Sequence, residues 1–107
     1  MGKLSYCLFA FGFSLISANA FSAQQYWEPD AEPFFLALHT FDENTSNALK
    51  ILIYHESLAC SRKLTGEEVQ SFAERHQVNL GIATMALVSN TPSIMRDITK
   101  KIQCEFP

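Results

Sequence analysis

The sequence lacks the short motifs that mark common catalytic sites. It contains no Gly-x-Ser-x-Gly or Ser-x-x-Lys nucleophile motif, and its four glycines form no phosphate-binding loop. His39, His55 and His76 are spaced too widely for a His-x-x-His or His-Glu-x-x-His metal motif. We therefore expect no enzyme, and no catalytic residue, metal ligand or cofactor is assigned.

An excess of positive charge is also missing. Eight lysines and arginines face eleven acids, so the net charge is −3. This balance argues against nucleic acid as a partner. The acids cluster early in the chain, because five of them precede Lys50, the second basic residue: Glu28, Asp30, Glu32, Asp42 and Glu43. Such a cluster is typical of a solvated face, or of a docking patch for a basic partner.

The longest apolar run lies at the N-terminus. Lys3 is followed by an apolar run over 8–16 and by Ala18-Asn19-Ala20, the small-residue pattern that signal peptidase accepts. The run is too short to span a membrane. Cys7 is not preceded by a lipoprotein motif, so we expect no membrane anchor. The pattern predicts a signal peptide over 1–20 and a soluble mature protein that is periplasmic or secreted.

The sequence has only three cysteines, and export would place the mature protein in an oxidising compartment where cysteines pair. Loss of Cys7 with the signal peptide leaves Cys60 and Cys104, and an even pair in an exported chain predicts one structural disulfide. Cys-x-x-Cys spacing, which a redox or metal role favours, is absent. Closing a loop of about 45 residues stabilises a fold by about 4 kcal/mol. A domain of about 87 residues benefits from that contribution.

The mature chain is predicted to form one helical domain over 30–107, after a short tail at 21–29. The first helix is expected over 30–41, where Asp30 is a good N-cap. Apolar residues follow it at helical spacing.

A second helix is expected to begin at Asn44 or Thr45, either of which can cap it, and to end at Cys60. The segment 49–54 is rich in residues that strands favour, so a strand is an alternative there.

The strongest local signal comes next. Thr65 and Glu68 have the spacing of a capping box, and apolar residues then recur at steps of three and four. This predicts one long helix over 65–88, with Gly81 as a point where it can bend or break. The stretch 78–88 is apolar on nearly every side, which indicates burial or cover by a partner; over 78–82 a strand is an alternative.

The last helix is expected to start with Thr91 as N-cap and Pro92 at its first position, and to end at Cys104. Helices of this length with short connections predict an all-α fold, a small antiparallel bundle of about four helices stapled by one disulfide.

A soluble bundle with surplus apolar surface indicates an apolar groove that receives a partner segment. The candidate partner-binding residues, each of which also fits a plain core, are Phe34, Phe35, Val69, Phe72, Ile82 and Met85.

From residue 52 onward the chain resembles the small helical pilotins of type II secretion and their non-lipidated periplasmic relatives. The resemblance rests on a helix ending in Cys60, the following Ser61-Arg62-Lys63-Leu64, the segment 72–80 and the second cysteine, Cys104. It implies that the two cysteines pair and that the bundle grips a C-terminal segment of the secretin, the channel subunit of the outer membrane. The chain departs from the family in having no lipobox and in placing Cys104 almost at its end.

These features favour an exported, soluble accessory protein that captures a segment of a partner protein, such as a secretion-channel subunit. One alternative is a periplasmic immunity or inhibitor protein that offers its acidic surface, from Glu28 to Glu43, to a toxic enzyme. A second alternative is a small secreted effector or hydrolase that uses a histidine. The oligomeric state is left open by the sequence.

Overall fold

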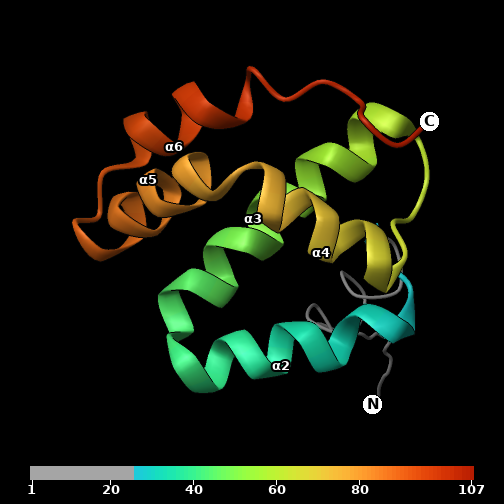
Figure 1. Ribbon diagram of the computed structural model, residues 1–107. Helices are drawn as coiled ribbons and strands as arrows, with labels where there is room; N and C mark the ends of the chain where they lie inside the picture. The colour runs from blue at the N-terminus through green and yellow to red at the C-terminus, as the bar shows by residue number, and fades with distance from the viewer. Residues whose placement is uncertain (1–25) are drawn as a thin grey trace, which may run out of the picture.

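The computed structural model describes residues 26–107, and their regular structure is helical apart from one isolated bridge between Trp27 and Leu64 (Figure 1). A single 3-10 turn, η1 (Pro29–Ala31), precedes α2 (Glu32–Phe41), α3 (Glu43–Cys60), α4 (Gly66–Arg75), α5 (Gln77–Val88) and α6 (Pro92–Thr99). The predicted all-α class is confirmed. The predicted signal peptide, 1–20, lies outside the described residues.

The first helix does not start as expected. Asp30 lies inside η1 and α2 begins at Glu32, so Asp30 is not its N-cap. Its Oδ1 atom instead accepts a hydrogen bond from the backbone N–H of Gly66, 2.9 Å away at the start of α4. A Cβ at position 66 would lie 2.5 Å from the Asp30 carbonyl oxygen, so this close approach requires glycine.

The second helix is continuous, which rules out a strand over 49–54. Its N-cap position is occupied by Asp42, so the expected start at Asn44 or Thr45 is wrong. The Thr45 hydroxyl donates to Asp42 Oδ2 at 2.6 Å and cannot cap the helix from inside its first turn. At the other end Ser61 adopts the left-handed conformation, with φ of 56°.

The predicted capping box at the start of α4 is confirmed. The backbone N–H of Glu68 donates to Thr65 Oγ1 at 3.2 Å, and the Thr65 N–H donates to Glu68 Oε1 at 2.9 Å. The predicted single helix over 65–88 is wrong, because His76, with φ −117° and ψ 39°, separates α4 from α5. The break is not at Gly81, which lies within α5, and the strand alternative over 78–82 is likewise excluded.

The last helix begins with Pro92 as expected but ends at Thr99, so Cys104 lies beyond it and not at its end. Thr91 holds the N-cap position without a capping hydrogen bond, because its hydroxyl pairs with that of Ser89 at 2.8 Å. Asn90, with φ of 53°, turns the chain between α5 and α6. The predicted disulfide joins Cys60 to Cys104.

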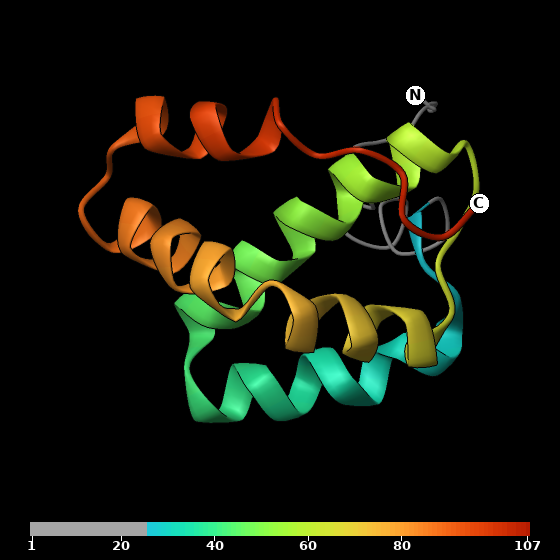
Figure 2. The same ribbon diagram turned by 45° about the horizontal axis from the view of Figure 1, so that its top comes forward.

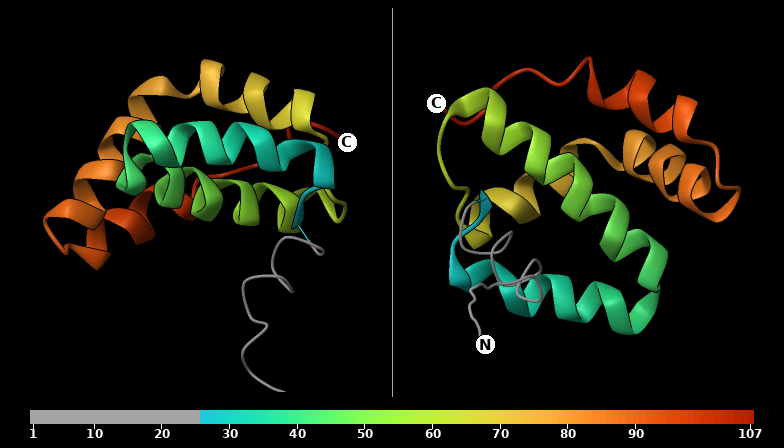
Figure 3. Two further views of the ribbon diagram at one scale, coloured as in Figure 1. Left: turned by 90° about the horizontal axis from the view of Figure 1, so that it is seen from below. Right: turned by 180° about the vertical axis from the view of Figure 1, so that it is seen from behind.

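The core lies mainly between α2, α3 and α4. Helix α3 contacts α2, α4 and α5. Helix α6 contacts α5 and forms an antiparallel hairpin with it, on the side of α5 away from α2 (Figure 2). The C-terminal segment then runs back to the end of α3 (Figure 3). The largest fully buried apolar side chains are Phe35, Leu49, Leu52, Ile53, Leu64 and Val69.

Trp27 falls inside the stretch expected to be a tail, yet its side chain is only 4% exposed. Its ring packs against Phe35 with centroids 4.6 Å apart, and its Nε1–H donates to Glu32 Oε2 at 2.6 Å. The adjacent backbone also joins the α3–α4 connection, because the Glu28 N–H donates to the Leu64 carbonyl at 2.8 Å.

Candidate functional site

Helix α5 carries an exposed apolar face, formed by Val78, Ile82, Met85 and Val88. Their exposed fractions are 76%, 43%, 62% and 58%. At 100° per residue these positions share one side of the helix. Because α5 has no charged residue over its whole length, the face also lacks the charges that normally keep a surface helix solvated. Among residues 26–107 no helix is long and apolar enough to cross a bilayer.

The residues predicted to line one groove are not brought together. Phe35, Val69 and Phe72 are at most 2% exposed and belong to the core, and Phe34 is half-buried against it. Of the six, Ile82 and Met85 are exposed, and both lie on the α5 apolar face.

Two hollows flank α6. One, of about 370 Å³, lies between α3, α5 and α6 and is lined by Leu87, Met95 and Arg96 among others. The other, of about 250 Å³, lies where Leu52, Phe72 and Ile98 approach the C-terminal segment. A third hollow, of about 560 Å³, lies between α2 and α3 beside Trp27.

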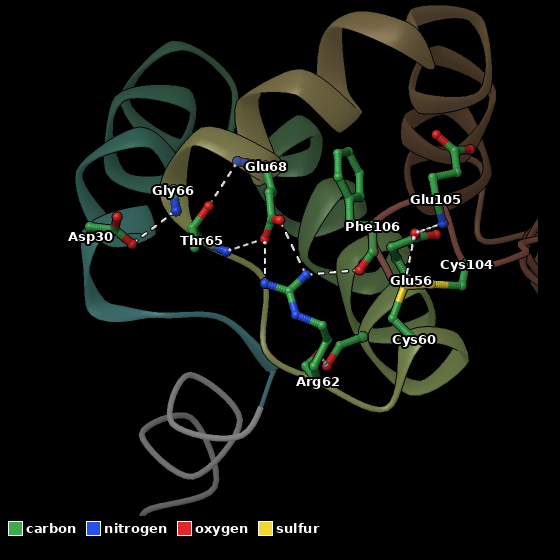
Figure 4. A network of polar contacts seen from close by, with 11 residues as sticks. Asp30, Glu56, Cys60, Arg62, Thr65, Gly66, Glu68, Cys104, Glu105 and Phe106 are labelled. Carbon is green, nitrogen blue, oxygen red and sulfur yellow. Dashed lines mark hydrogen bonds and ion pairs between the residues drawn. A yellow bond between two sulfur atoms is a disulfide. The ribbon is translucent and has the colours of Figure 1, made fainter.

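A buried carboxyl group lies beside the disulfide. Glu56 is 0% exposed, and its Oε2 atom is 3.4 Å from the Sγ atom of Cys60, one helical turn later in α3 (Figure 4). The same oxygen accepts a hydrogen bond from the Glu105 backbone N–H at 2.5 Å. Among the described residues, Glu56 Oε1 has no hydrogen-bond partner.

Burial, the largest influence, raises the pKa of Glu56. The hydrogen bond from the Glu105 N–H opposes that increase, and the Glu105 charge adds to it. The charge of His76 and the backbone of Phe106 act to lower the pKa, and the net direction is upward.

The C-terminal residues are held to the helices at several points. His76 Nε2 lies 2.6 Å from Glu105 Oε2, and Arg75 Nη1 lies 3.2 Å from Glu105 Oε1. Arg62 Nη1 donates to the Phe106 carbonyl at 2.9 Å, while Nη2 lies 3.1 Å from Glu68 Oε1. This segment is therefore part of the folded domain and forms one wall of the 250 Å³ hollow.

The half-buried carboxylate of Glu68 is the second acid with a shifted pKa. Burial acts to raise it, but hydrogen bonds from Thr65 and Arg62, together with the Arg62 charge, outweigh burial and lower the pKa of Glu68. Arg62 thus links the helix cap at Glu68 to the C-terminal segment at Phe106.

The histidines lie in three different places. His39 borders the 560 Å³ hollow, His55 the 370 Å³ hollow and His76 the 250 Å³ hollow. Burial lowers the pKa of His55. Within residues 26–107, one group has the mutual spacing of metal ligands, namely Glu56, Cys60 and Cys104, and its two sulfurs are joined to each other.

Three of the five early acids are engaged in internal bonds. Asp30 accepts from the Gly66 N–H, Glu32 accepts from the Trp27 indole, and Asp42 accepts from the Thr45 hydroxyl. These carboxylates contribute to the fold, which reduces what the segment can offer to a basic partner.

Sequence reasoning missed Glu56. A signal for it exists, because a residue four positions before Cys60 lies on the same helix face as that cysteine. The sequence pattern does not predict that Glu56 is buried, however, because its burial depends on the C-terminal segment that returns from α6.

No protein-family model, no curated protein and no solved structure matches this chain. The resemblance to pilotins stays a prediction that rests on the sequence features described above.

Proposed function

We propose that this protein is an exported binding protein that captures a segment of a partner protein on the α5 apolar face. The observation that carries the proposal is the exposure of Val78, Ile82 and Met85 on a helix without a charged residue. A contiguous apolar face of this kind on a small protein usually marks an interaction site.

The geometry suits recognition by side-chain packing. Anchors spaced by three and four residues are the pattern with which one amphipathic helix receives another. Met85 adds an unbranched, adaptable side chain to the face, which helps it to accommodate a partner's apolar residues. The capture of a secretion-channel segment, as in pilotins, is one form that this function takes.

The inhibitor alternative has less support, because Asp30, Glu32 and Asp42 make hydrogen bonds within the chain. The hydrolase alternative lacks a specific supporting geometry, because His39, His55 and His76 border different hollows.

The test compares two aspartate substitutions in the mature protein. Ile82→Asp places a charge on the α5 apolar face, whereas Leu36→Asp places the same charge at an exposed apolar position of α2, where Leu36 is 66% exposed. Each variant is immobilised and exposed to periplasmic extract of the host, and retained proteins are identified by mass spectrometry.

We expect a specific partner to be retained by the wild type and by Leu36→Asp, and to be lost with Ile82→Asp. Circular dichroism should show all three proteins to be equally helical. Retention of the same partner by Ile82→Asp would refute the proposal. Loss of the partner with Leu36→Asp alone would show that the binding site lies on α2 and not on α5.

A further inference from the structure

The Glu56 carboxyl group lies within reach of a disulfide sulfur, with Oε2 3.4 Å from Cys60 Sγ. Because a sulfur atom in a disulfide carries no hydrogen, a proton can pass along this contact only from the carboxyl group to the sulfur. The absence of any donor to Oε1 among the described residues also suits a neutral carboxyl group, which needs fewer donors than a carboxylate.

The charged groups around Glu56 support the neutral form. Glu105, whose N–H bonds to Glu56, brings a second negative charge close by, and burial raises the pKa of Glu56. The charge on His76 acts in the opposite direction, but His76 is itself bonded to Glu105. Arg75 also pairs with Glu105 and not with Glu56.

The disulfide lies beside a hollow. Cys60 and Cys104 are each partly exposed, and Cys104, which lies outside any helix, lines the 250 Å³ hollow. Thiol–disulfide exchange requires an incoming thiolate to reach one sulfur and the other sulfur to leave as a thiolate. The leaving step is faster when the departing thiolate is stabilised or protonated.

We propose that the Cys60–Cys104 disulfide is a redox-exchange site for an external dithiol, in which Glu56 is the proton donor to the departing Cys60 sulfur. A thiolate of the dithiol attacks Cys104 Sγ and forms a mixed disulfide with it. The bond between the two protein sulfurs breaks, and its electron pair goes to Cys60 Sγ, which takes the proton of Glu56.

The second thiol of the dithiol, as a thiolate, then attacks the dithiol sulfur that is bonded to Cys104. The bond between that sulfur and Cys104 Sγ breaks, and Cys104 leaves as a thiolate that takes a proton from water. The dithiol is oxidised to a disulfide, and the protein is reduced to two thiols. Glu56 regains a proton from solvent. In the reverse direction the Glu56 carboxylate accepts the proton of Cys60 as the disulfide forms again.

The consequence lies in the C-terminal segment. Once the covalent link is broken, this segment is held by Glu105 and Phe106 through noncovalent contacts alone. Since it walls the 250 Å³ hollow lined by Leu52 and Phe72, reduction loosens that wall. This redox role goes beyond partner capture on α5 and does not depend on it.

The test measures the rate of disulfide reduction by excess dithiothreitol in the folded protein. Free thiols are trapped by alkylation at successive times and counted by intact mass. The wild type, Glu56→Gln and a control, Glu67→Gln, are compared from acidic to mildly alkaline pH. Glu67 is an exposed acid in the first turn of α4. Each rate is divided by the concentration of dithiothreitol thiolate.

We expect Glu56→Gln to be reduced at least about tenfold more slowly than the wild type near neutral pH, and Glu67→Gln to match the wild type. The thiolate-corrected rate of the wild type should fall as pH rises and Glu56 ionises, while that of Glu56→Gln stays flat.

An equal or faster rate of reduction for Glu56→Gln would overturn the proposal. If Glu56 acted only as a negative charge that repels the incoming thiolate, its replacement by glutamine would speed the attack and not slow it. A flat corrected profile for the wild type would overturn it as well, and that result does not require any variant to fold.

Discussion

His76 and Glu105, separated by 29 residues, meet with Nε2 and Oε2 2.6 Å apart at the point where α4 gives way to α5. The His76 ring also packs against Phe72, with centroids 4.4 Å apart. The break between the two helices thus lies where the C-terminal segment contacts them, and not at Gly81.

This pair yields the first prediction. A double-mutant cycle with His76→Ala and Glu105→Ala should give a coupling free energy of about 0.5–1 kcal/mol, because both side chains are partly exposed. Urea unfolding of the four proteins measures it. If the two losses of unfolding free energy are additive, the contact contributes nothing to the stability of the fold.

The second prediction concerns pH. A carboxyl group with a raised pKa in the folded state stabilises the protein below its unfolded pKa, and this contribution is lost as pH rises through the folded pKa. The wild type should therefore lose stability relative to Glu56→Gln between about pH 4 and neutral pH. Urea midpoints at both pH values test this. A constant difference between the two proteins would contradict a raised pKa of Glu56.

The third prediction compares two glycines. Gly66→Ala should destabilise the protein by more than about 1 kcal/mol, because the added Cβ would lie 2.5 Å from a backbone oxygen. Gly81→Ala meets no atom within 4 Å and should stabilise α5 by about 0.5–1 kcal/mol. Thermal unfolding of both variants measures the effects. Equal changes in unfolding temperature for the two variants would show that the η1–α4 contact is looser than described.

The fourth prediction concerns the disulfide. Cys60→Ser should lower the free energy of unfolding by about 2–5 kcal/mol. Alkylation of the mature wild-type protein without reductant should label neither Cys60 nor Cys104. Two labelled thiols in protein from its native compartment would show that the pair is not bonded there.

Local sequence signals predicted the elements that depend on neighbouring residues. Thr65 and Glu68 bond to each other within one helical turn, so their spacing was sufficient to place the start of α4. The start of α3 was mispredicted because several residues near it are good N-caps by type. Asp42, and not Thr45, occupies the N-cap position. Asp30 is a good N-cap by type, but its carboxylate accepts a hydrogen bond from the backbone N–H of Gly66, which lies far away in the sequence.

Non-local contacts explain what the pattern could not predict. Apolar spacing runs unbroken through His76, and the contact that accompanies the break comes from Glu105. Val69 and Ile82 were both predicted to line the partner-binding groove, although Val69 lies in the core and Ile82 is exposed. Helical spacing identifies an apolar side chain, but the helices that pack on it decide whether it is buried.

Partner capture depends on the α5 apolar face, and crosslinking at a single position of this face tests it directly. A photoreactive phenylalanine analogue is placed at position 82, and in a separate protein at the control position 36 of α2. Both proteins are expressed in the host and irradiated. We predict that position 82 gives one dominant crosslinked partner and that position 36 gives none. Crosslinks at position 36 without any at position 82 would contradict partner capture by α5.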